Sequence, residues 1–258
     1  GILMATILDE IVSDTRLRVN FERTVRPLDE VREGCLVRPR RTGFPFERNL
    51  QADGMSFICE VKRASPSKGV ISEDFPYLDI AREYESMGAS AISVLTEPRH
   101  FRGEDRFLEE IADTVRTPVL RKDFVIDEYQ IYRAREIGAS AVLLIASILG
   151  DRQLADYREL SESLGMSALV EAHTRDEVER AVCSGASIIG INNRDLGTFK
   201  VDLGNSIRLR DSIPDDVVCV SESGISTADD IRRLTEAGFD AVLIGEAFMR
   251  SPGRRGLL

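Results

Sequence analysis

Short apolar runs alternate with amphipathic segments along most of this chain. Four of the runs are similar in sequence and begin at Gly88, Gly138, Gly185 and Gly238, roughly 50 residues apart. A glycine commonly ends a helix, and a near-continuous apolar run is typical of a strand buried on both faces of a parallel sheet. Together with four further runs between the copies, the pattern predicts eight strands, at residues 56–62, 90–95, 118–122, 140–145, 167–171, 187–191, 217–221 and 240–244.

Eight alternating strand and helix units indicate an α/β protein with a closed (β/α)8 TIM barrel, which needs about 250 residues. A six-stranded doubly wound sheet is the alternative if two runs are miscounted. We expect residues 51–258 to form the barrel and residues 1–50 a helical extension, within a single domain. In the extension, we predict helices at residues 4–18 and 27–32, followed by an Arg- and Pro-rich linker over residues 37–49.

Charge and composition narrow the possible partners. The chain is 43% hydrophobic and 30% charged with a net charge of −10, which excludes general disorder and makes it a poor binder of nucleic acid or anionic membranes. The basic run at residues 38–41 favours a solvated turn over an anion site. The longest apolar stretch, residues 141–149, is far shorter than the ~20 residues of a membrane span. We therefore expect a cytoplasmic protein.

The four cysteines show no metal-binding or disulfide pattern. No C-x-x-C motif occurs, and no histidine stands at a metal-ligand spacing from any of them. We predict reduced core thiols, and neither a metal nor a cofactor. The cysteines are Cys35, Cys59, Cys183 and Cys219.

Charged and polar residues gather where the predicted strands end. In a barrel of parallel strands these ends meet on one rim, where the chemistry takes place. Because side chains alternate along a strand, Glu60 and Lys62 share the face of Ile58. A structural ion pair explains any one of these residues equally well, but the set favours an active site. Its candidate catalytic residues are Glu60, Lys62, Lys122, Glu171, Asn192 and Glu222.

The residue types in this set indicate acid–base chemistry. Lysines neutralise an anionic substrate or donate a proton, and burial beside another cation lowers the pKa of a lysine; glutamates supply a base. No Ser-His-Asp or Cys-His arrangement is evident, and we expect His100 and His173 to be ordinary loop residues.

Glycines after the last two strands predict a phosphate site. Ser223 and Gly224 follow the seventh strand, while Gly245 and Glu246 follow the eighth. Loops after strands seven and eight, with exposed backbone N–H groups, form the common phosphate cradle of this fold. The loop at residues 65–69 is placed to close over the same anion, although tight turns alone would also explain the glycines.

The segment Glu60-Val61-Lys62-Arg63-Ala64-Ser65-Pro66-Ser67 resembles the E-x-K-x-x-S-P-S signature of indole-3-glycerol phosphate synthases. The resemblance extends over about residues 5 to 250. It continues in order through Leu95-Thr96-Glu97, Phe101, Gly103, Leu120-Arg121-Lys122-Asp123-Phe124, Leu169-Val170-Glu171, Gly190-Ile191-Asn192-Asn193-Arg194-Asp195-Leu196 and Ser221-Glu222-Ser223-Gly224-Ile225.

This resemblance implies a carboxy-lyase of tryptophan biosynthesis that converts 1-(2-carboxyphenylamino)-1-deoxyribulose 5-phosphate to indole-3-glycerol phosphate, CO₂ and water. By position in the motifs, Lys122 is the general acid, Glu171 the general base or electrostatic partner, and Lys62 the carboxylate contact and a second candidate acid. Glu60, Asn192 and Glu222 support them. The remaining matches are phosphate contacts at Ser65, Ser223, Gly224 and Gly245, and an aryl pocket of Phe101, Phe124 and Leu196.

Two departures from the family pattern carry expectations of their own. Glu246 stands where some members have a small residue, and we expect its side chain to point away while its N–H stays available. The eighth helix is expected to be short. The alternatives are another phosphate-binding barrel, such as an isomerase, and a barrel that binds ligand without turnover as a scaffold. We expect a monomer.

Overall fold

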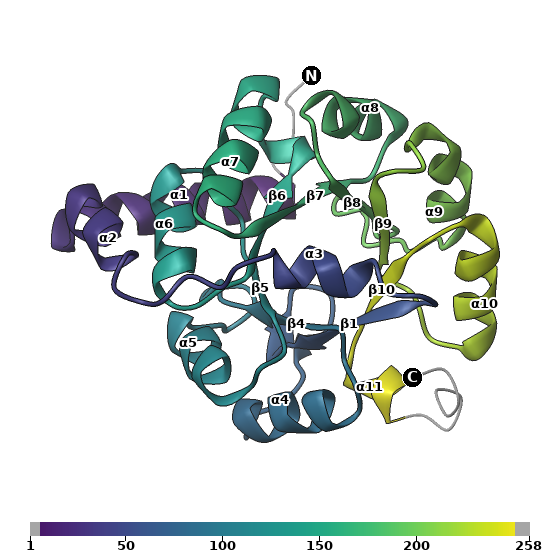
Figure 1. The fold of residues 1–258 in the computed structure, drawn as a ribbon, viewed down its shortest axis with the longest axis horizontal. Coiled ribbons are helices and arrows are strands. Elements are labelled where there is room, and N and C mark those ends of the chain that lie inside the picture. The colour runs from purple at the N-terminus through teal and green to yellow at the C-terminus, as the bar shows by residue number, and fades with distance from the viewer. Residues whose placement is uncertain (1–5, 251–258) are drawn as a thin grey trace.

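The computed structural model describes residues 6–250, and these form a closed barrel of eight parallel strands surrounded by helices (Figure 1). The order around the barrel is β1-β10-β9-β8-β7-β6-β5-β4, closing between β1 and β4. This confirms the (β/α)8 prediction and excludes the open sheet, and every predicted strand boundary lies within one residue of the observed one. The strands are β1 (Ser56–Val61), β4 (Ala91–Leu95), β5 (Val119–Lys122), β6 (Ala141–Ile145), β7 (Ser167–Ala172), β8 (Ile188–Asn192), β9 (Val218–Glu222) and β10 (Ala241–Ile244).

Local sequence signals set the ends of the surrounding helices. In α10 (Ala228–Ala237), Thr227 forms a capping box with Asp230, and Gly238 ends the helix at φ 96°. The helix after the last strand, α11 (Glu246–Met249), is short as expected. The other outer helices are α4 (Tyr77–Ser86), α5 (Asp105–Thr114), α6 (Glu128–Glu136), α7 (Asp151–Ser163), α8 (Arg175–Cys183) and α9 (Gly204–Leu209), with 3-10 turns η1 (Ala146–Ile148) and η2 (Arg210–Ser212).

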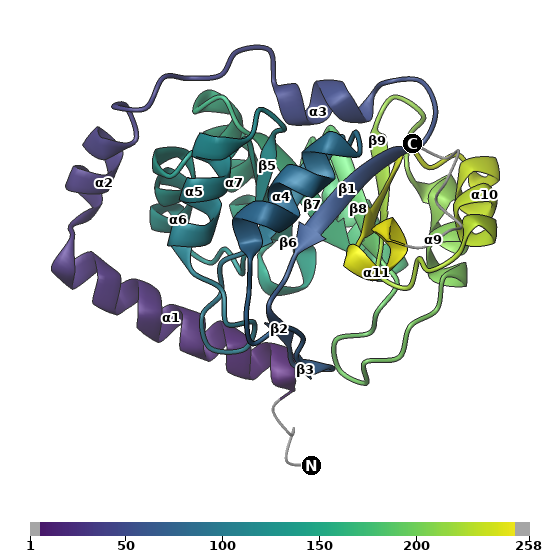
Figure 2. The ribbon, with the colours of Figure 1, turned by 90° about the horizontal axis from the view of Figure 1, so that it is seen from below.

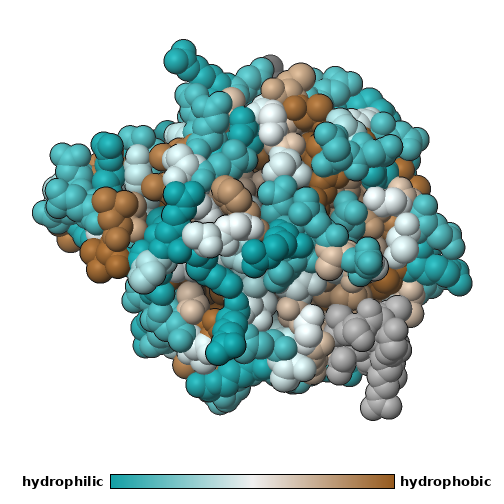
Figure 3. Space-filling view, in the orientation of Figure 1, coloured by the Kyte–Doolittle hydropathy of each residue, from teal (hydrophilic) through white to brown (hydrophobic). Residues whose placement is uncertain are grey.

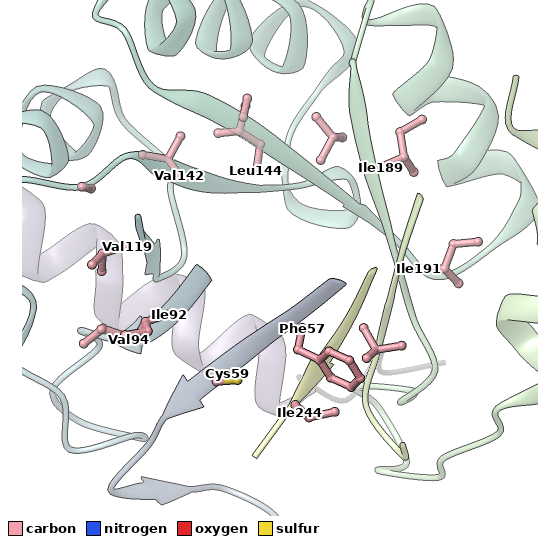
Figure 4. Close-up of a cluster of buried hydrophobic side chains, with 14 of the residues drawn as sticks. Phe57, Cys59, Ile92, Val94, Val119, Val142, Leu144, Ile189, Ile191 and Ile244 are labelled. Atoms are coloured by element: carbon pink, nitrogen blue, oxygen red, sulfur yellow. The ribbon is translucent and has the colours of Figure 1, made fainter. Parts of the chain in front are cut away.

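Alternation along the strands creates two apolar layers. Residues facing outward pack against the helices (Figure 4), among them Phe57, Val94 and Leu144. Residues facing inward, such as Ile58 and Leu169, fill the barrel itself. The inward-facing side chains of each strand continue along it to its C-terminal end. Charged side chains that end those rows therefore project into the mouth of the barrel.

The helical extension differs from the prediction in two places. The first helix, α1 (Ile7–Val25), runs well past residue 18, because Arg18 and Arg23 form ion pairs with Asp123 and Asp127 of the barrel, at 3.0 Å and 2.8 Å. Residues 4 and 5 of the predicted helix lie outside the described residues. A second helix, α2 (Leu28–Gly34), follows it.

The predicted linker contains a third helix, α3 (Pro45–Leu50). Pro45 has the fixed φ that suits the first turn of a helix, and Phe46 and Leu50 are completely buried against the barrel interior. The prediction of a linker across residues 45–49 was wrong. The arginines and prolines of this stretch indicated an exposed segment, although Phe46 and the adjoining Leu50 are core residues. Figure 2 shows α3 across one end of the barrel and α1 across the other, beside the strand pair β2 (Ala64–Ser65) and β3 (Gly69–Val70).

The cysteines are free thiols, and three of them are buried; Cys183 is exposed, so its expected core position was wrong. Within residues 6–250, no group of His, Cys, Asp or Glu is arranged to hold a metal ion. None of the described helices is long and apolar enough to cross a membrane.

Candidate active site

A buried carboxylate lies at the centre of the charged rim. Glu60, at the end of β1, is 5% exposed and accepts hydrogen bonds from Lys122 Nζ at 2.8 Å and Ser93 Oγ at 3.2 Å. Lys62 Nζ lies 3.5 Å from the same carboxylate. Burial alone would raise the pKa of Glu60, but the two ammonium groups hold it below its ordinary value. Glu60 is therefore an anion that fixes both lysines.

The two lysines differ in their titration. Burial opposes the charge on Lys122, but the carboxylates of Glu60, Glu222 and Glu171 outweigh it and raise the pKa of Lys122 above its ordinary value. For Lys62, the attraction of Glu60 is outweighed by burial and by the neighbouring lysines, so its pKa is lowered. The expected lowering of a lysine pKa thus holds for Lys62 and is wrong for Lys122.

Two more carboxyl groups are buried on the far side of Lys122. Burial raises the pKa of Glu171, and Lys122 only partly offsets this rise. Glu222 is 1% exposed and shares a hydrogen bond with Glu171, and burial followed by repulsion from Glu171 raises its pKa well above the ordinary value. A charged Glu222 is costly in such surroundings, so we infer that the shared proton of this pair lies on Glu222 and that Glu171 is the ionisable partner.

Gly190 provides the space that Glu222 occupies. A Cβ built on Gly190 would lie 2.3 Å from Glu222 Oε2 and 3.2 Å from Leu169 Cδ1. Gly190 lies opposite Glu171 in the register of β7 and β8. The family motif contains this glycine, but only the structure shows that it makes room for a carboxyl group.

We expect Gly190→Ala to fold and to lower kcat by at least ~10-fold, since the added methyl group pushes Glu222 away from Lys122 and Glu171. Steady-state kinetics and a circular dichroism spectrum test this together. The matched control is Gly150→Ala, where the nearest atom to the new Cβ is 3.7 Å away and the residue does not line the cavity. Equal kcat values in the two variants would contradict the positioning role.

Asn192 belongs to a polar network on the next two strands. Its Oδ1 accepts hydrogen bonds from Ser223 Oγ and the backbone N–H of Arg194, both at 2.9 Å. The neighbouring Asn193 is buried and binds Ser221 Oγ and the carbonyl of Ser223, each at 3.0 Å. Sequence analysis assigned no role to Asn193, whose position three residues after the inward-facing Gly190 gave no signal of these contacts.

The mouth of the barrel holds a cavity of about 420 Å³. Phe101 and Phe124 stand on one side with ring centroids 5.9 Å apart, and Leu196 also lines the cavity. Glu97 shapes this wall, since its carboxylate accepts the backbone N–H groups of residues 99–101. The apolar lining residues that sequence analysis had not assigned to the site include Ile7, Leu8 and Ile11 from α1 and Phe199 from the loop after β8.

The other side of the cavity carries backbone suited to an anion. Ser223 and Gly224 have consecutive left-handed φ values of 73° and 78°, and both line the cavity. Ser65, Lys68 and Gly245 also line this side. Twelve of the fourteen predicted site residues line the cavity. The exceptions are Glu222, buried beneath it, and Glu246, whose carboxylate turns to Arg250 at 3.2 Å as expected.

Both histidines lie in loops beside the site rather than in it. His100 Nε2 contacts Asp14 of α1 at 2.8 Å. His173 Nδ1 lies 2.6 Å from the carbonyl oxygen of Asn192. Each histidine therefore supports a neighbouring segment of the cavity wall.

A closed parallel barrel with convergent lysines and glutamates at the C-terminal ends of its strands defines a (β/α)8-barrel enzyme. The family model for indole-3-glycerol phosphate synthase matches residues 8–256. The chain is 50% identical over 252 residues to indole-3-glycerol phosphate synthase of Lacticaseibacillus paracasei (98% of this chain, 97% of that one) and 51% identical over 245 residues to that of Ruminiclostridium cellulolyticum (95% and 94%). The chain belongs to the indole-3-glycerol phosphate synthase family, and is a carboxy-lyase of tryptophan biosynthesis.

A more distant likeness concerns the fold alone. N-acetylmannosamine-6-phosphate 2-epimerase from Clostridium perfringens superposes with a TM-score of 0.59 at 14% identity, over 75% of this chain and 87% of that one. This agrees with the barrel architecture.

Proposed function

We propose that the cavity binds 1-(2-carboxyphenylamino)-1-deoxyribulose 5-phosphate in one orientation. The phosphate lies at Ser65, Ser223, Gly224 and the N–H groups of Gly245 and Glu246. The aryl ring lies against the apolar wall of Phe101, Phe124 and Leu196. This orientation is supported by the cavity itself, which is anion-binding on one side and aromatic on the other.

Lys122 is the general acid for ring closure in this proposal. When the aryl carbon attacks the ketone carbon, the C=O electron pair moves to oxygen, which needs a proton. Lys122 is held charged chiefly by the Glu60 carboxylate, to which it donates a hydrogen bond, so it delivers that proton from a fixed position. This arrangement is the observation that carries the proposal. Loss of CO₂ then returns its bonding electron pair to the ring.

Glu171 and Lys62 serve the later steps. Departure of the new hydroxyl group as water needs an acid for the leaving oxygen and a base for a proton of the five-membered ring. Glu171 is the base, helped by a raised pKa, while neutral Glu222 leaves it the single ionised group of that pair. Lys62 neutralises the substrate carboxylate and is a second candidate acid, favoured by its lowered pKa. Asn192 orients Ser223 through their 2.9 Å hydrogen bond.

Indole fluorescence after mixing the purified chain with the substrate tests the proposal. A growing signal supports turnover at this site. Saturable binding without a signal would favour the scaffold alternative. Interconversion of a phosphorylated sugar without release of CO₂ would favour an isomerase.

We expect Lys62→Met to raise KM at least ~10-fold and to slow turnover as well, because the substrate carboxylate loses its proposed cationic contact. Initial rates over a range of substrate concentrations separate the two effects. Met keeps the length and packing of the side chain. An unchanged KM would contradict the carboxylate contact.

We also propose that the chain works as a cytoplasmic monomer. Support for the cytoplasm comes from three buried free thiols. Size-exclusion chromatography with light scattering tests the monomer: a mass near 28.7 kDa is expected, and twice that mass would contradict it.

A further inference from the structure

A second cavity, of about 200 Å³, lies at the opposite end of the barrel from the active site. Its wall includes Val119, Ser140 and Met166, which stand at or just before the N-terminal ends of β5, β6 and β7. The segment joining α2 to α3 crosses this end of the barrel (Figure 1). In the same orientation, Figure 3 shows mainly hydrophilic atoms over the centre of this face.

Four guanidinium groups surround this cavity. Arg38, Arg41 and Arg135 line it. Arg40 lies at its edge, since a Cβ on the lining residue Gly165 would come within 2.5 Å of Arg40 Nε. Three of the four come from the basic run at residues 38–41, for which the sequence favoured a solvated turn.

Negative charge does not balance these arginines. Arg38 pairs with the carboxylate of Asp113 at 2.7 Å. Within the described residues, Arg40, Arg41 and Arg135 form no ion pair, although Arg135 is only 8% exposed. Burial lowers the pKa of Arg135 below its ordinary value, and the guanidinium groups of Arg40 and Arg38 lower it further. Arg135 is the buried member of this cluster, whereas Arg40 and Arg41 are exposed; because the chain as a whole is acidic, the cluster is a local exception.

Backbone carbonyls account for part of this cluster. Arg135 Nη2 and Nε donate to the carbonyls of Arg38 and Leu164, at 2.8 Å and 3.2 Å, and Arg41 Nη2 donates to the carbonyl of Arg116 at 3.0 Å. Leu164 is the C-cap of α7, where a cation is stabilised, and these bonds explain the orientation of the two side chains. They do not explain Arg40, which has no hydrogen bond within residues 6–250, nor the open volume that the guanidinium groups enclose.

We propose that this cavity, which we call the arginine cavity, is a binding site for a phosphate-type dianion. Guanidinium groups present N–H donors in a planar fork that matches phosphate oxygens, and Ser140 adds a hydroxyl group 3.5 Å from Arg41 Nη1. A bound dianion would connect the segment at residues 38–41 to α6 and to the start of β6. We therefore expect the bound dianion to raise the stability of the fold without contacting the substrate.

The test uses inorganic pyrophosphate as the probe, on full-length enzyme whose active site is filled with saturating indole-3-glycerol phosphate. Ionic strength is held constant with NaCl, and melting temperature is measured against pyrophosphate concentration. We expect a saturable rise of at least ~2 °C for the wild type. The double variant Arg40→Gln/Arg41→Gln should lose this rise and keep its kcat.

Arg152→Gln is the matched control, because it removes the same charge from a side chain that is 94% exposed and distant from the arginine cavity. If the double variant does not fold, Arg40→Gln alone should weaken pyrophosphate binding at least ~10-fold in calorimetry. The proposal is overturned if the wild type shows no saturable rise. It is also overturned if the arginine variants respond like Arg152→Gln, which would indicate a general salt effect.

Discussion

Replacement of Lys122 by alanine is expected to lower kcat by at least ~10³-fold while the barrel remains folded. The loss removes the proton donor of ring closure and leaves three carboxyl groups, of Glu60, Glu171 and Glu222, around an empty position. Without the ammonium group the carboxyl groups repel one another, so the pKa of Glu60 should rise. Single-turnover indole fluorescence measures the chemical step directly, and thermal melting reports the fold.

The chain offers a matched control for this variant. It contains four lysines, and three of them, Lys62, Lys68 and Lys122, line the cavity. Lys200 is exposed and lies outside the cavity lining, so Lys200→Ala should leave kcat unchanged within a factor of about 2. Turnover of Lys122→Ala close to that of Lys200→Ala would rule out the acid assignment.

The distribution of lysine and arginine has a chemical reason. Arginine stays protonated in proteins, whereas the pKa of lysine moves readily with its surroundings. The opposite shifts of Lys62 and Lys122 show this within a single cluster. Arg121, next to Lys122, is instead a buried structural cation that pairs with Asp105 at 2.9 Å. Proton transfer therefore falls to lysines, and arginines hold elements together.

The eight strands were predictable because each is an apolar run bounded by glycine or charge, and because both faces of every strand are buried. The catalytic row was predictable for a related reason. Alternation along β1, β5 and β7 places Glu60, Lys122 and Glu171 on the inner face, and the barrel brings those faces together.

Features that depend on contacts between distant segments were not predictable in the same way. The second half of α1 lacks a clear apolar period, and its helix is fixed by Arg18 and Arg23, which reach residues more than a hundred positions later. The sign of the Lys122 pKa shift depends on three carboxylates from three strands. Nothing in the sequence distinguishes Gly190 until the fold places the side chain of Glu222 beside it.

Replacement of Glu171 by glutamine is expected to lower kcat by about 10²- to 10³-fold, because the amide keeps the shape of the side chain but accepts no proton. Burial raises the pKa of Glu171. When the pH is lowered, the wild type should therefore lose activity at a pH higher than the ordinary pKa of a glutamate. The sign follows from the role: as pH falls through this raised pKa, Glu171 takes up a proton and the base is lost.

A pH profile of kcat therefore separates a base from a residue that only holds the fold. In Glu171→Gln the acidic limb should disappear, and the remaining slow reaction should be nearly independent of pH on that side. Glu222→Gln is the matched control, since an amide imitates the neutral carboxylic acid that we infer for Glu222. It should keep the acidic limb of Glu171 at about the same pH, because the group that it replaces is already neutral and contributes no negative charge. An acidic limb that survives unchanged in Glu171→Gln would assign the base to another group and leave Glu171 as an electrostatic partner.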